Sequence, residues 1–241
     1  MNEATAMSTG TAQHAAIRPL LSIRSLAVTI QSVQALRGLS LDVGAGEMVG
    51  LLGRNGAGKT TLMRSVMGHL PPSAGTIEID GKPLSAMPRH ARAALGVGYM
   101  PEDRGLVPEL TVEENILVPV WVSRTLKAPD RLAFVYDVLP ELRDMRDRRA
   151  LLLSGGQQKL VALARALAVG TRLLLLDEPF EGVAPALSQR LSDVIGGLRG
   201  ERLAVLIAQS DLNHSRSLLD REVVIERGAN APSGKALHAS A

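Results

Sequence analysis

Polar and apolar residues alternate in short runs through the first part of the chain, a spacing typical of β-strands. Strands are predicted at 21–30, 35–43 and 75–84, and an Asp-Gly pair in the last of these indicates a turn. The run "MVGLL" at 48–52 is apolar throughout and predicts a fully buried strand. We interpret this part of the chain as an antiparallel β portion beside one buried strand.

The rest of the chain alternates between helical and strand patterns. From about Val112 to Leu142 apolar residues recur at helical spacing, and Thr111 with Glu114 matches a capping box. Further helices are predicted at 59–67, 156–168 and 185–199, and further strands at 173–176, 203–208 and 222–226. Such alternation predicts an α/β fold with a mostly parallel sheet covered by helices, and an inserted helical lobe spanning about 105–150.

One domain is predicted at 21–228, between two tails. Residues 1–20 lack the basic start and apolar stretch of a signal peptide and are expected to be mobile. The small, polar segment 229–241 is expected to be loose as well. No run approaches the roughly 18 apolar residues that a membrane span requires, so we expect any membrane to be crossed by another chain.

The amino-acid composition argues against several classes of function. Hydrophobic residues make up 46% and charged residues 21%, as in an ordinary globular protein. The net charge is only +3 and aromatics are 2%, which argues against a nucleic-acid partner. The absence of cysteine excludes disulfides and thiol chemistry, and fits a reducing cytosol.

The stretch "GRNGAGKTT" at 53–61 predicts a phosphate-binding loop. Gly53, four residues, then Gly58, Lys59 and Thr60 is the phosphate-loop spacing, and it lies between a predicted strand and a predicted helix. Glycines let backbone N–H groups turn toward anionic oxygens, and the helix N-terminus adds partial positive charge. Lys59 would reach the β- and γ-phosphates, and the Thr60 hydroxyl would bind Mg²⁺. The candidate loop residues are Gly53, Arg54, Asn55, Gly56, Ala57, Gly58, Lys59, Thr60 and Thr61.

A phosphate loop occurs in kinases, switch GTPases and motors alike, so a second motif is needed. "LLLLDEP" at 173–179 is an apolar strand that ends in two acids. Asp177 is placed to hold Mg²⁺ through oxygen. Glu178, facing away from Asp177, could polarise a water for in-line attack on the γ-phosphate.

The stretch "LSGGQQ" at 153–158, taken with the two motifs above, resembles the ATP-binding subunits of ABC transporters. The resemblance runs from about Leu21 to Gly228, with the motifs in family order. It implies that Ser154, Gly155 and Gly156 bind the γ-phosphate held by the opposite subunit. It therefore also implies ATP hydrolysis with Mg²⁺ in a dimer, formed with itself or with a paired homologous ATPase.

A narrower resemblance concerns "GYMPEDRGLVPELTVEENI" at 98–116, "LPPSAGTIEIDGKPL" and "EPFEGVAP". These stretches are similar to the smaller ATPase of importers for branched-chain amino acids and to their urea and amide relatives. The resemblance implies integral membrane permease subunits as partners and, indirectly, a substrate-binding protein. It also implies a cytoplasmic position on the inner face of the plasma membrane. The permease helix is expected to dock on the helical lobe near Leu106 to Leu117.

Four positions depart from the broad family pattern. Glu102 replaces a glutamine that contacts Mg²⁺ and the attacking water, and a carboxylate could still bind Mg²⁺ there. Gln209 replaces a histidine that senses the γ-phosphate, and its amide can donate the same hydrogen bond without a charge. Ile30 stands near the place of the aromatic that stacks on adenine, and Ala184 replaces an aspartate at the dimer interface.

Two other functions stay open at this point. Glu102, Ala184 and Gln209 favour a nucleotide sensor that binds ATP and hardly hydrolyses it, whereas Glu178 favours hydrolysis. A non-transport ABC ATPase that remodels nucleic acid or translation complexes usually carries coiled coils or a second ATPase domain. This chain has neither heptad runs nor a second phosphate loop.

Overall fold

The computed structural model describes residues 18–199, 202–211 and 216–231. The helices are α1 (Lys59–Val66), α2 (Ala91–Ala94), α3 (Val112–Trp121), α4 (Ala128–Val138), α5 (Gly155–Val169) and α6 (Pro185–Gly197). The strands are β1 (Leu21–Ile30), β2 (Val33–Val43), β3 (Met48–Leu52), β4 (Ala74–Ile79), β5 (Lys82–Pro83), β6 (Val97–Met100), β7 (Leu173–Asp177), β8 (Ala204–Gln209), β9 (Arg221–Glu226) and β10 (Ala229–Asn230). Short 3-10 turns lie at Leu84–Ala86, Pro140–Met145, Ala150–Leu152 and Arg216–Leu218.

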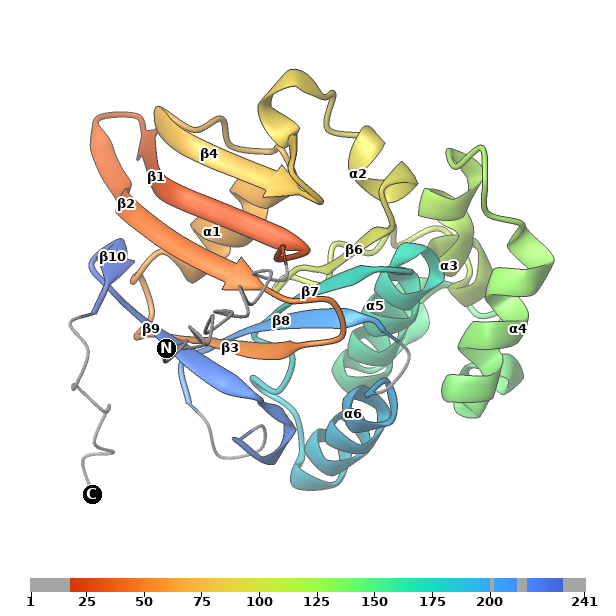
Figure 1. Cartoon of the computed structure of the whole chain (residues 1–241). Coiled ribbons are helices and arrows are strands. Elements are labelled where there is room, and N and C mark those ends of the chain that lie inside the picture. The colour runs from red at the N-terminus through yellow and green to blue at the C-terminus, as the bar shows by residue number, and fades with distance from the viewer. Residues whose placement is uncertain (1–17, 200–201, 212–215, 232–241) are drawn as a thin grey trace, which may run out of the picture.

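The described strands form two sheets (Figure 1). The first is antiparallel, with the order β2-β1-β4-β5. The second has the order β10-β9-β3-β8-β7-β6, and the strands from β9 to β6 run parallel. Only β10 pairs antiparallel, at the outer edge of β9. The predicted α/β class, with a parallel core and an antiparallel β portion, is confirmed.

The parallel sheet separates two hydrophobic cores. On β7, Leu173 and Leu175 belong to the core shared with the antiparallel sheet and α1, whereas Leu174 and Leu176 belong to the core under the helices. Side chains alternate across a strand, so a strand covered on both faces needs apolar residues at every position. That requirement explains the uninterrupted leucines of this strand.

The helical lobe rests on α5. Helices α3 and α4 pack against α5 and against each other, and their buried residues join the core on that face of the sheet (Figure 1). The predicted capping box opens α3, because Glu114 N donates to Thr111 Oγ1 and Thr111 N donates to Glu114 Oε2. Helix α5 is therefore the connection between the lobe and the sheet.

The lobe is less continuous than predicted. The helical stretch expected from Val112 to Leu142 is broken at 122–127, where Ser123 Oγ accepts from the N–H groups of Thr125 and Leu126. A local turn of this kind competes with helical hydrogen bonding, and the proline near the start of α4 favours a new helix there. The segment with helical spacing therefore consists of two helices, α3 and α4, followed by the 3-10 turn at Pro140–Met145.

The domain ends differ from the predicted ends. Leu20 is buried and its carbonyl accepts from Asp80 N, so ordered structure begins before residue 21. Ala229 and Asn230, predicted to belong to a loose tail, form β10, and the Asn230 amide bonds the backbone of Ser40 in both directions. The remaining parts of the predicted tails, 1–17 and 232–241, lie outside the described residues.

Candidate functional site

The carboxyl ends of the parallel strands bring the predicted site residues together. The phosphate loop follows β3, Asp177 ends β7 and Gln209 ends β8. The register pairs Leu52 with Gln209, and Gly53 N donates to the Gln209 carbonyl at 3.1 Å. Ligands of open α/β sheets bind outside this edge, because the loops there are free to vary.

Backbone geometry explains three glycines of the phosphate loop. Gly56 and Gly58 have φ of 79° and 112°, a region that side chains disfavour. At Gly53 the φ is ordinary, but a Cβ there would lie 2.5 Å from the Ile225 carbonyl oxygen. Gly58 is the N-cap of α1, and no side chain accepts a hydrogen bond at this cap. The first N–H groups of the helix therefore point into the loop with their partial positive charge uncompensated by a capping side chain.

Lys59 lies at the centre of this loop and is 5% exposed. Its Nζ donates to the Gly53 carbonyl at 2.5 Å and lies 3.0 Å from Glu178 Oε1. Glu178 is 5% exposed and follows the strand with a φ of 47°. The Glu178 carboxylate contacts Lys59, whereas the Asp177 carboxylate lies beside Thr60 and Tyr99. The predicted cation and the predicted water-activating acid thus lie in direct contact.

Asp177 has the surroundings of a cation ligand. It is fully buried, and its Oδ1 has no hydrogen-bond partner among the described residues. Burial raises the pKa of the Asp177 carboxyl to about 6, while the Thr60 hydroxyl acts in the opposite direction. A buried, unsatisfied carboxylate oxygen beside a hydroxyl fits Mg²⁺, which takes oxygen ligands.

The described residues hold no cluster of three or more His, Cys, Asp or Glu side chains arranged for a metal. Mg²⁺ is commonly bound by one or two protein oxygens, with phosphates and water completing its shell. Thr60 and Asp177 would supply the protein oxygens, and the ion would neutralise charge on the phosphates. Glu102 is exposed on a loop that lines the same side of the site, and its charge contributes to the raised pKa of Asp177.

Ser154, Gly155 and Gly156 open α5 at the surface. Ser154 and Gly155 are exposed, and Ser154 is the N-cap of a complete capping box. Gln157 N donates to Ser154 Oγ at 3.3 Å, and Ser154 N donates to Gln157 Oε1 at 3.0 Å. The serine oxygen accepts within its own chain, so its hydroxyl proton can be donated outward. This arrangement can bind an anion that arrives from outside the chain.

Gln209 and Ser210 stand next to the acids. Gln209 is 3% exposed, and its position at the end of β8 lies beside the start of the phosphate loop. Both the N–H and the hydroxyl of Ser210 donate to Glu178 Oε2, at 3.2 and 3.3 Å. The sequence analysis did not single out Ser210, because a serine after a strand is common and only the fold brings it to Glu178.

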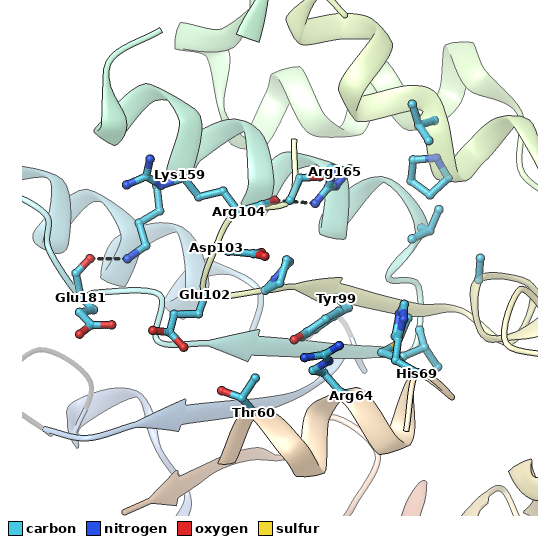
Figure 2. A pocket seen from close by; sticks show the side chains of 18 of the residues that line it. Thr60, Arg64, His69, Tyr99, Glu102, Asp103, Arg104, Lys159, Arg165 and Glu181 are labelled. Atoms are coloured by element: carbon cyan, nitrogen blue, oxygen red, sulfur yellow. Dashed lines mark hydrogen bonds between the residues drawn. The ribbon is translucent and has the colours of Figure 1, made fainter. Parts of the chain in front are cut away.

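A cavity of about 990 Å³ opens beside the site, between α1, the loop after β6 and the helical lobe (Figure 2). Thr60 lines one end and Glu102 points into the same space. Arg64 and His69 line it from the α1 side, and burial with nearby Arg64 and Arg89 lowers the pKa of His69. We call this space the lobe cavity.

Two of the predicted departures lie away from this cluster. Ile30 is 39% exposed on the antiparallel sheet, and Ala184 is an exposed cap of α6. Lys159 is a further buried charge that the sequence analysis did not single out. The signal for it was present, since this lysine comes immediately before "LVALARALAV", a stretch that is apolar except for Arg165.

Comparison with known proteins agrees with this geometry. The family described as ABC transporter matches residues 36–181. The lipopolysaccharide export ATP-binding protein LptB of Escherichia coli strain K12 is 36% identical over 210 residues, covering 86% of this chain and 87% of LptB. The branched-chain amino acid transport ATP-binding protein BraG of Pseudomonas aeruginosa is 34% identical over 209 residues, covering 87% and 90%.

Solved structures share the fold. The dimeric bacterial ABC transporter cassette MJ0796 superposes with a TM-score of 0.80 at 22% identity, covering 88% of this chain and 97% of that one. The ADP conformation of the cassette MJ1267 gives 0.75 at 25% identity, covering 91% and 92%. No helix in the described ranges is long and apolar enough to cross a membrane. The chain belongs to the ATP-binding subunits of ABC transporters and is an ATP hydrolase of that family.

Proposed function

We propose that two cassettes sandwich two Mg·ATP and that ATP-driven closure moves a membrane permease. The observation that carries this proposal is the unequal placement of the two anion sites. Lys59 is buried within the chain, whereas the Ser154 cap faces outward. A γ-phosphate held by Lys59 of one chain is then completed by Ser154, Gly155 and Gly156 of the opposite chain. That chain is a second copy or a paired homologous ATPase.

The residues of one chain divide the work. Backbone N–H groups from Gly53 to Thr61 bind the phosphates, and Lys59 neutralises them. Asp177 and Thr60 would hold Mg²⁺, and Glu102 would supply a further oxygen. Glu178 orients and deprotonates the attacking water. Gln209 donates a neutral hydrogen bond to the γ-phosphate.

Glu178 is held by Lys59, whose Nζ lies 3.0 Å from Glu178 Oε1. ATP phosphates compete for the same ammonium, and binding them frees the carboxylate from Lys59. Hydrolysis then separates the γ-phosphate from ADP, so that it no longer links Lys59 of one chain to Ser154 of the opposite chain. The chains open, and the permease is driven between its inward- and outward-facing states.

The lobe cavity is the proposed docking place of the permease. It is lined by Gly105, Val118 and Pro119, which flank the segment Leu106 to Leu117 expected to dock the permease, and it reaches Thr60 and Glu102. A helix seated there would therefore contact the proposed nucleotide site. The protein would act at the cytoplasmic face of the plasma membrane, with a substrate-binding protein engaged only through the permease. No nucleic-acid partner is part of this proposal.

We propose uptake of branched-chain amino acids or related small solutes as the transport task. The narrow sequence motifs and the similarity to BraG support it. Lipopolysaccharide export is a second candidate, supported by the similarity to LptB. Co-purification from detergent-solubilised membranes separates them, because each task requires a different permease. An export permease would contradict uptake.

The dimer is tested with Glu178→Gln, which keeps the shape of the side chain and removes its basicity. The variant should bind Mg·ATP, lose roughly 10²–10⁴-fold in turnover and elute as a dimer when ATP is added. If the opposite chain is a paired homologue, the shift should require that homologue. Light scattering after size exclusion measures both states.

The matched variant adds Ser154→Arg to Glu178→Gln. A bulky cation at the outward cap should abolish the ATP-dependent dimer and leave ATP binding by the monomer nearly intact. A single Ser154→Arg variant that hydrolyses ATP at the parent rate as a monomer would contradict the sandwich.

A further inference from the structure

Lys159 is a buried charge that the proposed hydrolysis does not use. It follows Ser154 by five residues on α5 and is 3% exposed. Its ammonium donates to the main-chain carbonyl of Glu181, the contact drawn between α5 and the loop after β7 (Figure 2). Burial lowers the pKa of Lys159, so the protein bears a desolvation cost for this contact.

The Glu181 carbonyl, which accepts from Lys159, lies at the end of the turn that begins at Glu178. Glu178 N donates to the Ala208 carbonyl at 3.0 Å, which fixes the start of the turn on β8. Glu181 N donates to the Glu178 carbonyl at 3.2 Å and closes it. Within this turn Glu178 has a φ of 47°. Lys159 therefore fixes one of the two ends of this turn.

The preceding residue holds the other loop of the site. Gln158 Oε1 accepts from Arg104 Nη1 at 2.8 Å, and Arg165 donates to the carbonyls of Arg104 and Gly105 at 2.6 and 2.5 Å. These contacts tie the loop carrying Glu102 to α5. One rigid helix thus holds both loops that approach the γ-phosphate, and its exposed end is the Ser154 cap.

We propose that Lys159 is a positioning residue that makes the direction of Glu178 depend on the position of α5. The inference rests on the proposed function, in which the Ser154 end of α5 meets nucleotide bound by the opposite chain. Docking of that nucleotide moves α5, and Lys159 carries Glu181 and the turn with it. Glu178 then faces the attacking water only when two chains have closed.

The test compares Lys159→Met with Arg131→Met. Arg131, on α4, likewise donates to main-chain carbonyls, those of Leu167 and Ala168 at 2.8 Å, at the end of α5 remote from the site. Each variant removes a cation that donates to a main-chain carbonyl and keeps an apolar chain of similar length. Thermal unfolding of both variants measures the purely structural loss.

Lys159→Met should lower kcat for ATP roughly ten- to a hundredfold, because small misplacements of reacting groups have effects of this size. Its KM for ATP should stay within about twofold, since Lys59 and the phosphate loop are unchanged. In the Glu178→Gln background it should still dimerise with ATP. Lys159→Arg, which retains the charge and donors, should restore most of kcat, and Arg131→Met should keep kcat within about twofold.

An unchanged kcat in Lys159→Met overturns the inference, as does an equal fall in both methionine variants. If Lys159→Met does not fold, Lys159→Gln is measured, and the same fall in kcat with an unchanged KM is required. The proposed function fails differently: Glu178→Gln would show no ATP-dependent dimer while Lys159 is intact.

Discussion

The two proposed anion sites of this chain differ in burial and in charge. At the phosphate loop, Lys59 and Glu178 are both 5% exposed and lie 3.0 Å apart. At the start of α5, Ser154 and Gly155 are exposed and carry no charge of their own. A buried site with charges provides binding energy and reactivity, whereas an exposed neutral cap provides recognition at little desolvation cost. The difference supports the proposal that one site binds ATP and that the other recognises ATP bound by the opposite chain.

The largest effect is expected at the buried site. Lys59→Ala should weaken ATP binding by about 2–3 kcal/mol, roughly 30- to 150-fold, because a charge-assisted contact to a partly buried anion is lost. Isothermal titration calorimetry measures the change. Ser154→Ala serves as the matched variant, and it should leave monomer affinity nearly unchanged. An equal loss of ATP affinity in the two variants would contradict the distinction between the two sites.

Asp177 should make the buried site sensitive to pH. Its folded pKa of about 6 lies above the ordinary value of 3.8, so the folded state binds the proton more tightly than the unfolded state. Stability therefore falls as pH rises from about 4 to about 6, and the loss persists at neutral pH. Asp177→Asn, which resembles the protonated acid, should raise the Tm of the protein in EDTA at pH 7.5.

The same substitution should have little effect on Tm near pH 4, where Asp177 is protonated in the folded state. It should also remove the stabilisation that Mg²⁺ with ATP gives the parent at pH 7.5. Unfolding scans at the two pH values measure both effects. A lower Tm for Asp177→Asn at pH 7.5 without metal would contradict the assigned burial cost.

The smallest effect is expected at the exposed cap. Ser154→Ala removes the acceptor of Gln157 N and should lower the free energy of unfolding by ~1 kcal/mol, the usual value of an N-cap. Chemical denaturation measures it. Ser154→Gly should cost only a few tenths of a kcal/mol. A fall in the free energy of unfolding as large as that expected for removing a buried polar residue would show that the cap is part of the core.

The sequence predicted correctly those features that depend on a local residue pattern. The phosphate loop, the leucine strand and the capping box of α3 follow from spacing and turn chemistry, so their elements matched the structure. Strand β6 was not predicted, because the four-residue run "VGYM" is too short to carry a periodic signal. The break between α3 and α4 depends on one serine side chain that competes with the helix.

Long-range contacts in the site could not be predicted. Ser210 reaches Glu178 only because β8 lies beside β7, and Lys159 reaches Glu181 only because α5 packs on that sheet. The left-handed φ of Glu178 has no local sign either, since glutamate rarely adopts it. Residue type and order indicated the chemistry, and the sheet order determined which side chains meet.

The four consecutive leucines of β7, whose side chains enter the two cores alternately, have a consequence for thermal unfolding of the protein. Because Leu173 and Leu175 serve one core and Leu174 and Leu176 the other, neither core can open without exposing a face of the shared sheet. The free energies of the two cores are therefore coupled through a single strand. Heating should produce one calorimetric peak, with the lobe and the antiparallel sheet unfolding as a single cooperative unit.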